Sequence, residues 1–331
     1  MIIKKDRVVF WDIAKAFGML LVIYGHLMFT FDSRGINTPM NQWIYSFHMA
    51  LFFIISGYFF CSSLKKDFMT VLKTKSMQLI WPVIVWSVIS FVINELIILE
   101  PSKICDNVVS FFNSIGYIKG LWFLKALFIY YITAYIAIKL FKRTWVAAFV
   151  CIVGLSFIHK ISFIAIFPAF FWIGHFLKKY NGWLNSRYVL PFSMVISVLS
   201  FFLWKTEYSY VAQNMDPISI SMRLLAGTSW SITVIMLSKI FAERFPTSKI
   251  IDCGAKVGTT TIGIYCMHEA LFLNFRWKPF YEAIQLNNDL ILFIAAVIIY
   301  VCTYGLYSIF IQVRLMKIIL FGCFSAGNSN S

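Results

Sequence analysis

The chain has 331 residues, of which 60% are hydrophobic and 19% aromatic, while only 13% are charged. A soluble domain carries about a quarter charged residues, so this composition excludes an ordinary soluble protein and predicts one that crosses a lipid bilayer several times. The net charge of +15 comes from short blocks of Lys and Arg between apolar runs. Because such blocks are typical of membrane topology, we expect a bilayer partner and no nucleic-acid partner.

Apolar runs of helical length follow one another along the whole chain. A span needs about 20 apolar residues at a rise of about 1.5 Å per residue. Ten runs are predicted to be transmembrane helices: 10–31, 43–63, 79–99, 121–140, 145–158, 161–177, 188–204, 218–240, 258–275 and 290–312. The predicted fold is therefore an all-α polytopic membrane helix bundle of about ten transmembrane helices, in a single domain over residues 1–331.

The loops between these runs predict an orientation. If the N-terminus lies inside, the inside segments hold 19 Lys and Arg, counting Lys139 and Lys239 at the inner ends of their runs, and the outside segments hold 7. Because cytoplasmic loops carry an excess of Lys and Arg, we expect both termini to be cytoplasmic. The seven cysteines are scattered singly, without a spacing typical of a metal site or a disulfide framework. We therefore expect no metal.

The first run carries Asp12, Lys15 and His26. An Asp or Lys at the centre of a membrane helix costs roughly 2.5–3.5 kcal/mol, so a helix that only spans the bilayer would not retain them. Lys15 and His26 are eleven residues apart, so they face nearly the same direction and lie about 16 Å apart along the axis. Asp12 precedes Lys15 by one turn, a spacing that allows an ion pair. The first helix is predicted to form one wall of a polar channel.

Polar groups in other runs are expected at similar depths in the membrane. They are His48 in the second run, Lys125 in the fourth, Arg223 in the eighth, and the pair His268 and Glu269 in the ninth. Histidines, cations and a carboxylate in one zone are the components of a general-base site with charge stabilisation. This pattern makes His26, His48 and Arg223 candidate catalytic residues.

Structural interpretations compete with these functional ones. A membrane His such as His48 often makes only a hydrogen bond between packed helices. Long cations such as Arg223 and Lys125 can extend toward the membrane surface. The small residues Ser56 and Gly57 in "ISGYFF" predict close helix packing rather than catalysis.

Two blocks of the sequence resemble the acyltransferase-3 family of integral membrane acyltransferases. "WDIAKAFGMLLVIYGH" resembles the family's opening block, in which a basic residue precedes a histidine by eleven positions, and "YSFHMALFFIISGYFF" resembles its second block. "LWFLKALF" and "GIYCMHEALF" resemble looser later blocks. The basic residue is most often Arg in the family. This chain has Lys15 at that position, which resembles the branch of the family that contains the fucose acetylases. Ala50 replaces a family proline, which predicts a straight second helix.

The resemblance implies an O-acyltransferase of the bacterial inner (cytoplasmic) membrane. It would move acetyl from cytoplasmic acetyl-CoA to a hydroxyl of a surface or exported glycan, or of a lipid-linked saccharide, and glycan-assembly proteins are candidate partners. An uncharged His26 is suited to act as the general base, and His48 or Arg223 would stabilise the oxyanion.

The anionic CoA is expected to dock at basic residues of the cytoplasmic face. The candidates are Lys15, Lys73 and Lys75, with Asp12 holding Lys15 in position. Two other functions fit the same residues. A transporter or flippase could use an intramembrane polar path, and an inactive relative could serve as a scaffold.

Overall fold

The structure is a computed structural model and describes residues 8–31, 38–98, 121–157, 162–205, 216–273 and 288–322. Within these ranges the chain is helical and contains no strand, which confirms the all-α expectation. The helices, in chain order, are α1 (Val9–Phe31), α2 (Pro39–Phe60), α3 (Phe68–Lys75), α4 (Trp81–Ile98), α6 (Trp122–Phe141), α7 (Thr144–Ser156), α8 (Ser162–Lys179), α9 (Val189–Phe202), α10 (Pro217–Arg244), α11 (Lys249–Gly258), α12 (Thr261–His268), α14 (Asp289–Phe310) and α15 (Arg314–Phe321).

Six helical stretches of the described residues are long and apolar enough to cross a membrane, so the protein is a multi-pass membrane protein. They are Val9–Phe31, Pro39–Lys65, Phe68–Ile93, Trp122–Phe141, Pro217–Arg244 and Asp289–Phe310. Helices α7 and α9 are apolar but have only 13 and 14 residues. At about 1.5 Å per residue each is roughly 20 Å long, less than the hydrocarbon core. The count of ten spans stays a prediction. So does the cytoplasmic location of the termini, because residues 1–7 and 323–331 lie outside the described part.

Two π-helical turns interrupt predicted runs. The turn Ser76–Ile80 joins α3 to α4, so helix begins at Phe68, well before the expected run 79–99. The turn Glu269–Leu273 follows α12 directly, inside the run 258–275. Such turns add a residue to one helical turn and are frequent at functional sites. By contrast, α2 continues without a break from Pro39 to Phe60, as the absence of a proline at position 50 predicts.

Several helices begin at a residue whose side-chain oxygen accepts a backbone N–H of the first turn. These residues are Thr38, Asp67, Asp216, Ser248 and Asn288. Such caps satisfy donors that a helix leaves unpaired at its start. At the start of α10, hydrogen bonds from the hydroxyl and the backbone N–H of Ser219 hold the pKa of the Asp216 carboxyl below its ordinary value.

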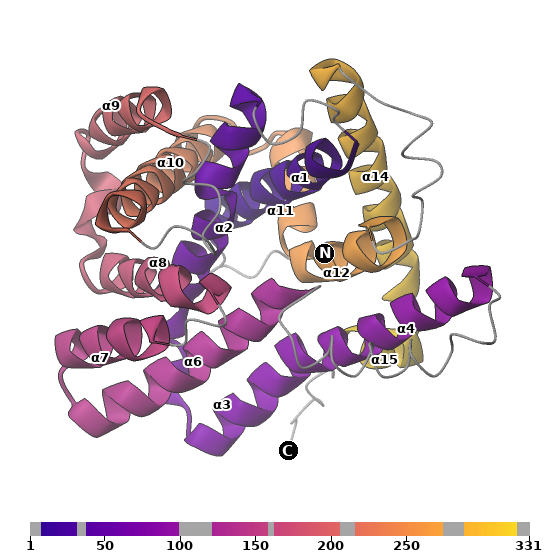
Figure 1. The fold of residues 1–331 in the computed structure, drawn as a ribbon, viewed down its shortest axis with the longest axis horizontal. Helices are drawn as coiled ribbons and strands as arrows, with labels where there is room; N and C mark the ends of the chain where they lie inside the picture. Colours follow the sequence, from indigo (N-terminus) through magenta and orange to yellow (C-terminus); the bar gives the residue numbers. More distant parts are fainter. Residues whose placement is uncertain are drawn as a thin grey trace.

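Helices α1 and α2 lie at the centre of the bundle (Figure 1). Helix α2 packs against α8, α10 and α1, while α1 also packs against α11 and α14. The contact between α2 and α8 is close at Gly57, where a Cβ atom would overlap the backbone carbonyl of Phe171. This confirms that Gly57 serves helix packing. Gly258 of α11 similarly lies against the backbone of Asp12, so α11 packs closely against the first turns of α1.

Gly57→Ala is expected to destabilise the protein by roughly 1–3 kcal/mol, because two packed backbones would have to separate to admit the methyl group. A matched control is Gly154→Ala in α7, where a Cβ atom would meet nothing within 4 Å. The midpoint of thermal unfolding in detergent would measure both. Equal midpoints for the two variants would contradict the close packing of α2 on α8.

Candidate active site

His26 of α1 and His268 at the end of α12 meet inside the bundle, although 242 residues separate them in sequence. Their Nδ1 and Nε2 atoms are 3.1 Å apart. The ring planes differ by 19° and the ring centroids are 5.3 Å apart. The centroid distance exceeds the nitrogen distance by about the sum of the two ring radii, so the rings lie end to end in nearly one plane. This is the geometry of an N–H···N hydrogen bond.

The hydrogen-bond network assigns the protons of this pair. Nδ1 of His268 lies 3.2 Å from the carbonyl oxygen of Ile264, which can only accept, so Nδ1 carries the proton. In the neutral ring Nε2 of His268 is then an acceptor, and His26 donates to it from Nδ1. This leaves the Nε2 lone pair of His26 without a partner among the described residues. His26 is thereby prepared to act as a base.

Glu269 lies beside both histidines. One of its carboxylate oxygens is 3.7 Å from His26 Nδ1 and 4.0 Å from His268 Nε2. The three donor atoms lie within 4.8 Å of one another, close enough to consider a metal ion. Metal ligands, however, direct their lone pairs at one common point, whereas these two imidazole nitrogens point at each other. The arrangement is therefore that of a hydrogen-bonded pair with an adjacent carboxylate.

His48 of α2 is buried, with 3% of its surface exposed. Its Nδ1 lies 2.7 Å from the carbonyl oxygen of Ile44, to which it donates. Because a neutral ring then has no proton on Nε2, His48 can donate to an oxyanion only when it is protonated.

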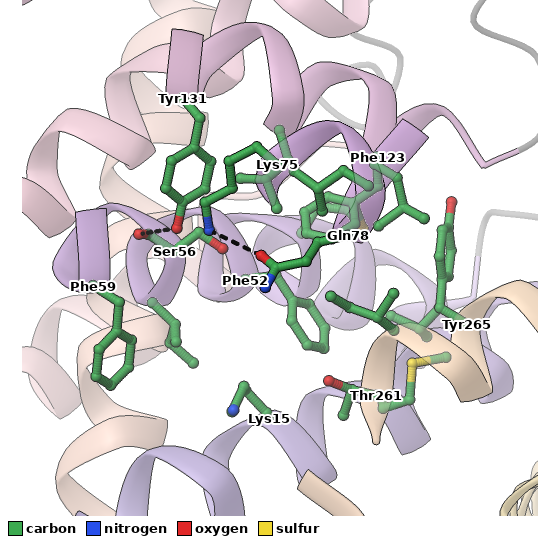
Figure 2. A pocket seen from close by; sticks show the side chains of 18 of the residues that line it. Lys15, Phe52, Ser56, Phe59, Lys75, Gln78, Phe123, Tyr131, Thr261 and Tyr265 are labelled. Atoms are coloured by element: carbon green, nitrogen blue, oxygen red, sulfur yellow. Dashed lines mark hydrogen bonds between the residues drawn. The ribbon is translucent and has the colours of Figure 1, made fainter. Parts of the chain in front are cut away.

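A cavity of about 210 Å³ lies between α1, α2, α6, α12 and the π-turn Ser76–Ile80. Lys15 and Lys75 extend toward it from opposite sides, and Gln78, Tyr131 and Tyr265 line it (Figure 2). The remaining lining residues are mostly apolar. The cavity therefore combines a mostly apolar interior with two ammonium groups.

Both lysines are held by neighbours. Lys15 Nζ is 2.6 Å from a carboxylate oxygen of Asp12, one turn earlier in α1. Lys75 Nζ lies 4.0 Å from the centre of the Tyr131 ring and 3.3 Å from the Gln78 side-chain oxygen. An ion pair and a cation–π contact fix the position of each ammonium without removing its charge. Both cations can therefore bind an anionic ligand.

The cavity ends one layer below the histidine pair. Lys15, Met19 and Val22 line it from one stripe of α1, and His26 is the next residue on that stripe. Tyr265 lines the opposite side, and its ring centroid is 5.5 Å from that of His268. The stripe is polar at Lys15 and His26 and apolar between them, and a polar channel along the first helix stays a prediction. Met19 and Val22 give it an apolar centre, which suits an uncharged arm.

Two predicted residues do not line the cavity. Lys73 is exposed on α3, about half a turn away from Lys75. Arg223 is buried in α10 with 7% of its surface exposed, and within the described residues it makes no hydrogen bond or ion pair with His26 or His48. Conversely, the sequence did not single out Tyr131, Tyr265 or Gln78. In the sequence each of these residues is a side chain with a polar end group inside an apolar run. Such residues are common in membrane helices, so they predict a site only weakly.

Comparisons with known proteins identify the family of this chain. A family model described as "Acyltransferase domain" matches residues 8–309. The chain is 25% identical over 292 residues to the nodulation protein NolL of Mesorhizobium japonicum, an alignment that covers 81% of this chain and 77% of that protein. No solved structure matches. Because the family model spans nearly the whole described bundle, including both histidines and the cavity, the chain belongs to the acyltransferase-3 family.

Proposed function

We propose that this protein is a membrane O-acetyltransferase that uses acetyl-CoA and a glycan or lipid-linked saccharide acceptor. The observation that carries the proposal is that a cavity with two ammonium groups ends beside a histidine pair with an available lone pair. A thioester donor needs a binding site for an anionic carrier, and a hydroxyl acceptor needs a base. The two features supply these requirements in adjacent layers of one bundle.

The donor half of the proposal places CoA in the cavity. Its phosphates meet Lys75 and Lys15, and its thin pantetheine arm follows the apolar stripe of α1 toward His26. Asp12 holds the Lys15 ammonium in place. Lys73, on the exposed face of α3, is a candidate for an outer phosphate contact. A lysine binds phosphate as a point charge rather than through a planar fork, so contact geometry is flexible.

The chemical step uses the lone pair of His26. Nε2 of His26 removes the proton of an acceptor hydroxyl as its oxygen attacks the thioester carbonyl carbon, forming a C–O bond. The C–S bond then breaks, and the CoA sulfur takes the proton back from His26 to leave as the thiol. Glu269 stabilises the imidazolium between these transfers. Protonated His48 is one candidate oxyanion donor and Arg223 is the other.

The topology of the proposal places the donor on the cytoplasmic side of the bacterial inner membrane. Acetyl-CoA is then delivered at the end of the bundle where α1 begins, and the acceptor meets His26 nearer the other end of α1. The Lys15 to His26 stripe, about 16 Å long, connects the two. Glycan-assembly proteins are candidate partners because an exported acceptor must be delivered and removed.

Lys75→Gln and Lys15→Gln are each expected to raise KM for acetyl-CoA by about tenfold while kcat changes little, because each removes one charged contact to phosphate. Lys139→Gln is the matched control. Lys139 also lies over a tyrosine of α6, 5.5 Å from the centre of the Tyr135 ring, but does not line the cavity. Initial rates over a range of acetyl-CoA concentrations would measure all three. A KM for Lys139→Gln raised as much as for Lys75→Gln would contradict the donor site.

The whole proposal is tested by the transfer of radiolabelled acetyl from acetyl-CoA to the glycan and glycolipid fraction of membranes. Membranes with the protein should label this fraction, and matched membranes without it should not. If the native acceptors are present and no protein-dependent label forms, the proposal fails. Uptake or flipping of a labelled saccharide in the same membranes would then support a transporter. If the membranes show neither acetyl transfer nor saccharide transport, the scaffold alternative is supported.

A further inference from the structure

Arg223 of α10 is a buried cation for which the described part of the chain provides no hydrogen-bond or ion-pair partner. It lies six residues into the candidate span Pro217–Arg244 and has 7% of its surface exposed. Its Nε and Nη2 atoms are buried and have no hydrogen-bond partner among the described residues. Lys15 and Lys75, by contrast, have Asp12 and Tyr131. Because a guanidinium stays protonated and leaving its N–H groups unpaired is costly, this position indicates a missing anion.

Trp230 presents a second unpaired donor on the same face of α10. Seven residues turn a helix almost twice, so Trp230 and Arg223 face the same way and are about 10.5 Å apart along the axis. The indole Nε1 of Trp230 is buried and has no hydrogen-bond partner among the described residues. Gly227 lies between the two and packs against Ala50 of α2. Both unpaired donors therefore lie on the side of α10 that packs against α2.

Aromatic rings of α2 accompany these donors. The Trp43 ring lies edge-on to the Trp230 ring at 5.5 Å, and the Phe47 ring stacks on it at 5.8 Å. Flat aromatic surfaces beside hydrogen-bond donors suit a ligand with one apolar face and several hydroxyls. We call Arg223, Trp230, Trp43 and Phe47 the α2–α10 strip.

The α2–α10 strip lies near the histidine pair rather than near the lysines. Its α2 residues belong to the first turns of that helix. Gly25, the neighbour of His26, packs against Ile44 and Tyr45 in the same turns. The α2 residues that line the lysine cavity come later, at Ser56 and Phe59 among others. An anion at Arg223 would therefore belong to the acceptor rather than to CoA.

We infer that the α2–α10 strip binds an acidic sugar unit of the acceptor. The guanidinium of Arg223 takes the oxyanion of that unit, either a carboxylate or a phosphate, in two parallel N–H···O bonds. The indole N–H of Trp230 donates to a sugar hydroxyl, and the ring of Trp43, which is only partly buried, covers the apolar face of the sugar. The acceptor class is thus a uronic acid or a phosphorylated sugar. This inference rests on the proposed function for its acceptor but can be tested by binding alone.

The test begins with the full chain in lipid nanodiscs and without acetyl-CoA. Equilibrium dialysis would compare three labelled probes of equal size: a disaccharide with a glucuronate unit, the same disaccharide with a phosphate, and its neutral glucose counterpart. One acidic probe should bind the wild-type chain about tenfold more tightly than the neutral probe, and the two acidic arms identify the anion. Equal binding of all three probes would overturn the inference without any variant.

Substitutions then locate the binding. Arg223→Lys keeps the charge but removes the fork, so it should lose most of the preference for the acidic probe. Trp230→Phe keeps an aromatic ring but removes the indole N–H, so it should weaken the binding of acidic and neutral probes to the same extent. Arg187→Lys is the matched control, because Arg187 is exposed and contacts the Tyr188 hydroxyl. An acidic preference kept by Arg223→Lys would overturn the assignment.

Acetyl transfer separates this inference from the proposed function. At saturating acetyl-CoA, Arg223→Lys should raise KM for an acidic acceptor by about tenfold and leave KM for its neutral counterpart unchanged. A fall in kcat with KM unchanged would instead give Arg223 the oxyanion role and overturn the inference. Selective binding of an acidic probe without any acetyl transfer would support the strip while the proposed function fails.

Discussion

His26→Ala is expected to lower kcat for acetyl transfer by about 10³-fold, with little change in KM for acetyl-CoA. Removing the imidazole takes away the group that accepts the hydroxyl proton, and general-base catalysis contributes roughly 10²–10⁴-fold. Because the cavity ends before His26, donor binding should survive. Labelled acetyl transfer at saturating donor would measure the loss.

A second buried histidine provides the control for that substitution. His175 of α8 lies 3.3 Å from the Cys61 sulfur and belongs to neither the cavity nor the histidine pair. His175→Ala removes the same volume from the bundle and should retain kcat within about threefold, since no reacting group is lost. If both variants lose activity equally, His26 is not the base.

His268→Ala is expected to lower kcat by about 10²-fold, although His268 does not contact the acceptor in the proposed step. Without it, Nδ1 of His26 loses its acceptor, and the proton can move to Nε2, where it blocks the base. A glutamine carbonyl can also accept from Nδ1, so His268→Gln should retain more activity than His268→Ala.

A double-mutant cycle distinguishes this orienting role from an independent one. If His268 acts only through His26, the double variant His26→Ala with His268→Ala should be no slower than His26→Ala alone. Rate losses that multiply in the double variant would show that His268 acts independently of His26. Both single variants should elute from size exclusion as the wild type does, so that misfolding is not mistaken for coupling.

The helical architecture could be predicted from the sequence because apolar runs of helical length are a local signal. The stripe on α1 could be predicted for the same reason, since the spacing of Lys15 and His26 fixes their shared direction within one helix. The pairing of Lys15 with Asp12 follows from one turn of helix and is present at 2.6 Å. Each of these features depends only on residues close in the chain.

The remainder of the site depends on contacts between helices, which spacing does not encode. His268 and Glu269 were visible as polar residues of an apolar run, but nothing local places them against His26. Lys73 and Lys75 belong to one basic block of the sequence. Of the two, Lys75 alone reaches the cavity, because of how α3 and the π-helical turn after it pack against the bundle. Both outcomes were decided by tertiary packing rather than by helix propensity.

The long sequence separation of the histidine pair has a consequence for biogenesis. Asp12 and Lys15 can neutralise each other as soon as α1 forms, because they are one turn apart. His26 must wait for a partner 242 residues downstream. At about 5–20 residues per second of synthesis, that interval lasts roughly 12–48 s. During it the nascent first helix holds an unsatisfied imidazole in the bilayer, so its insertion should depend on retention beside the translocon until the C-terminal third of the chain emerges.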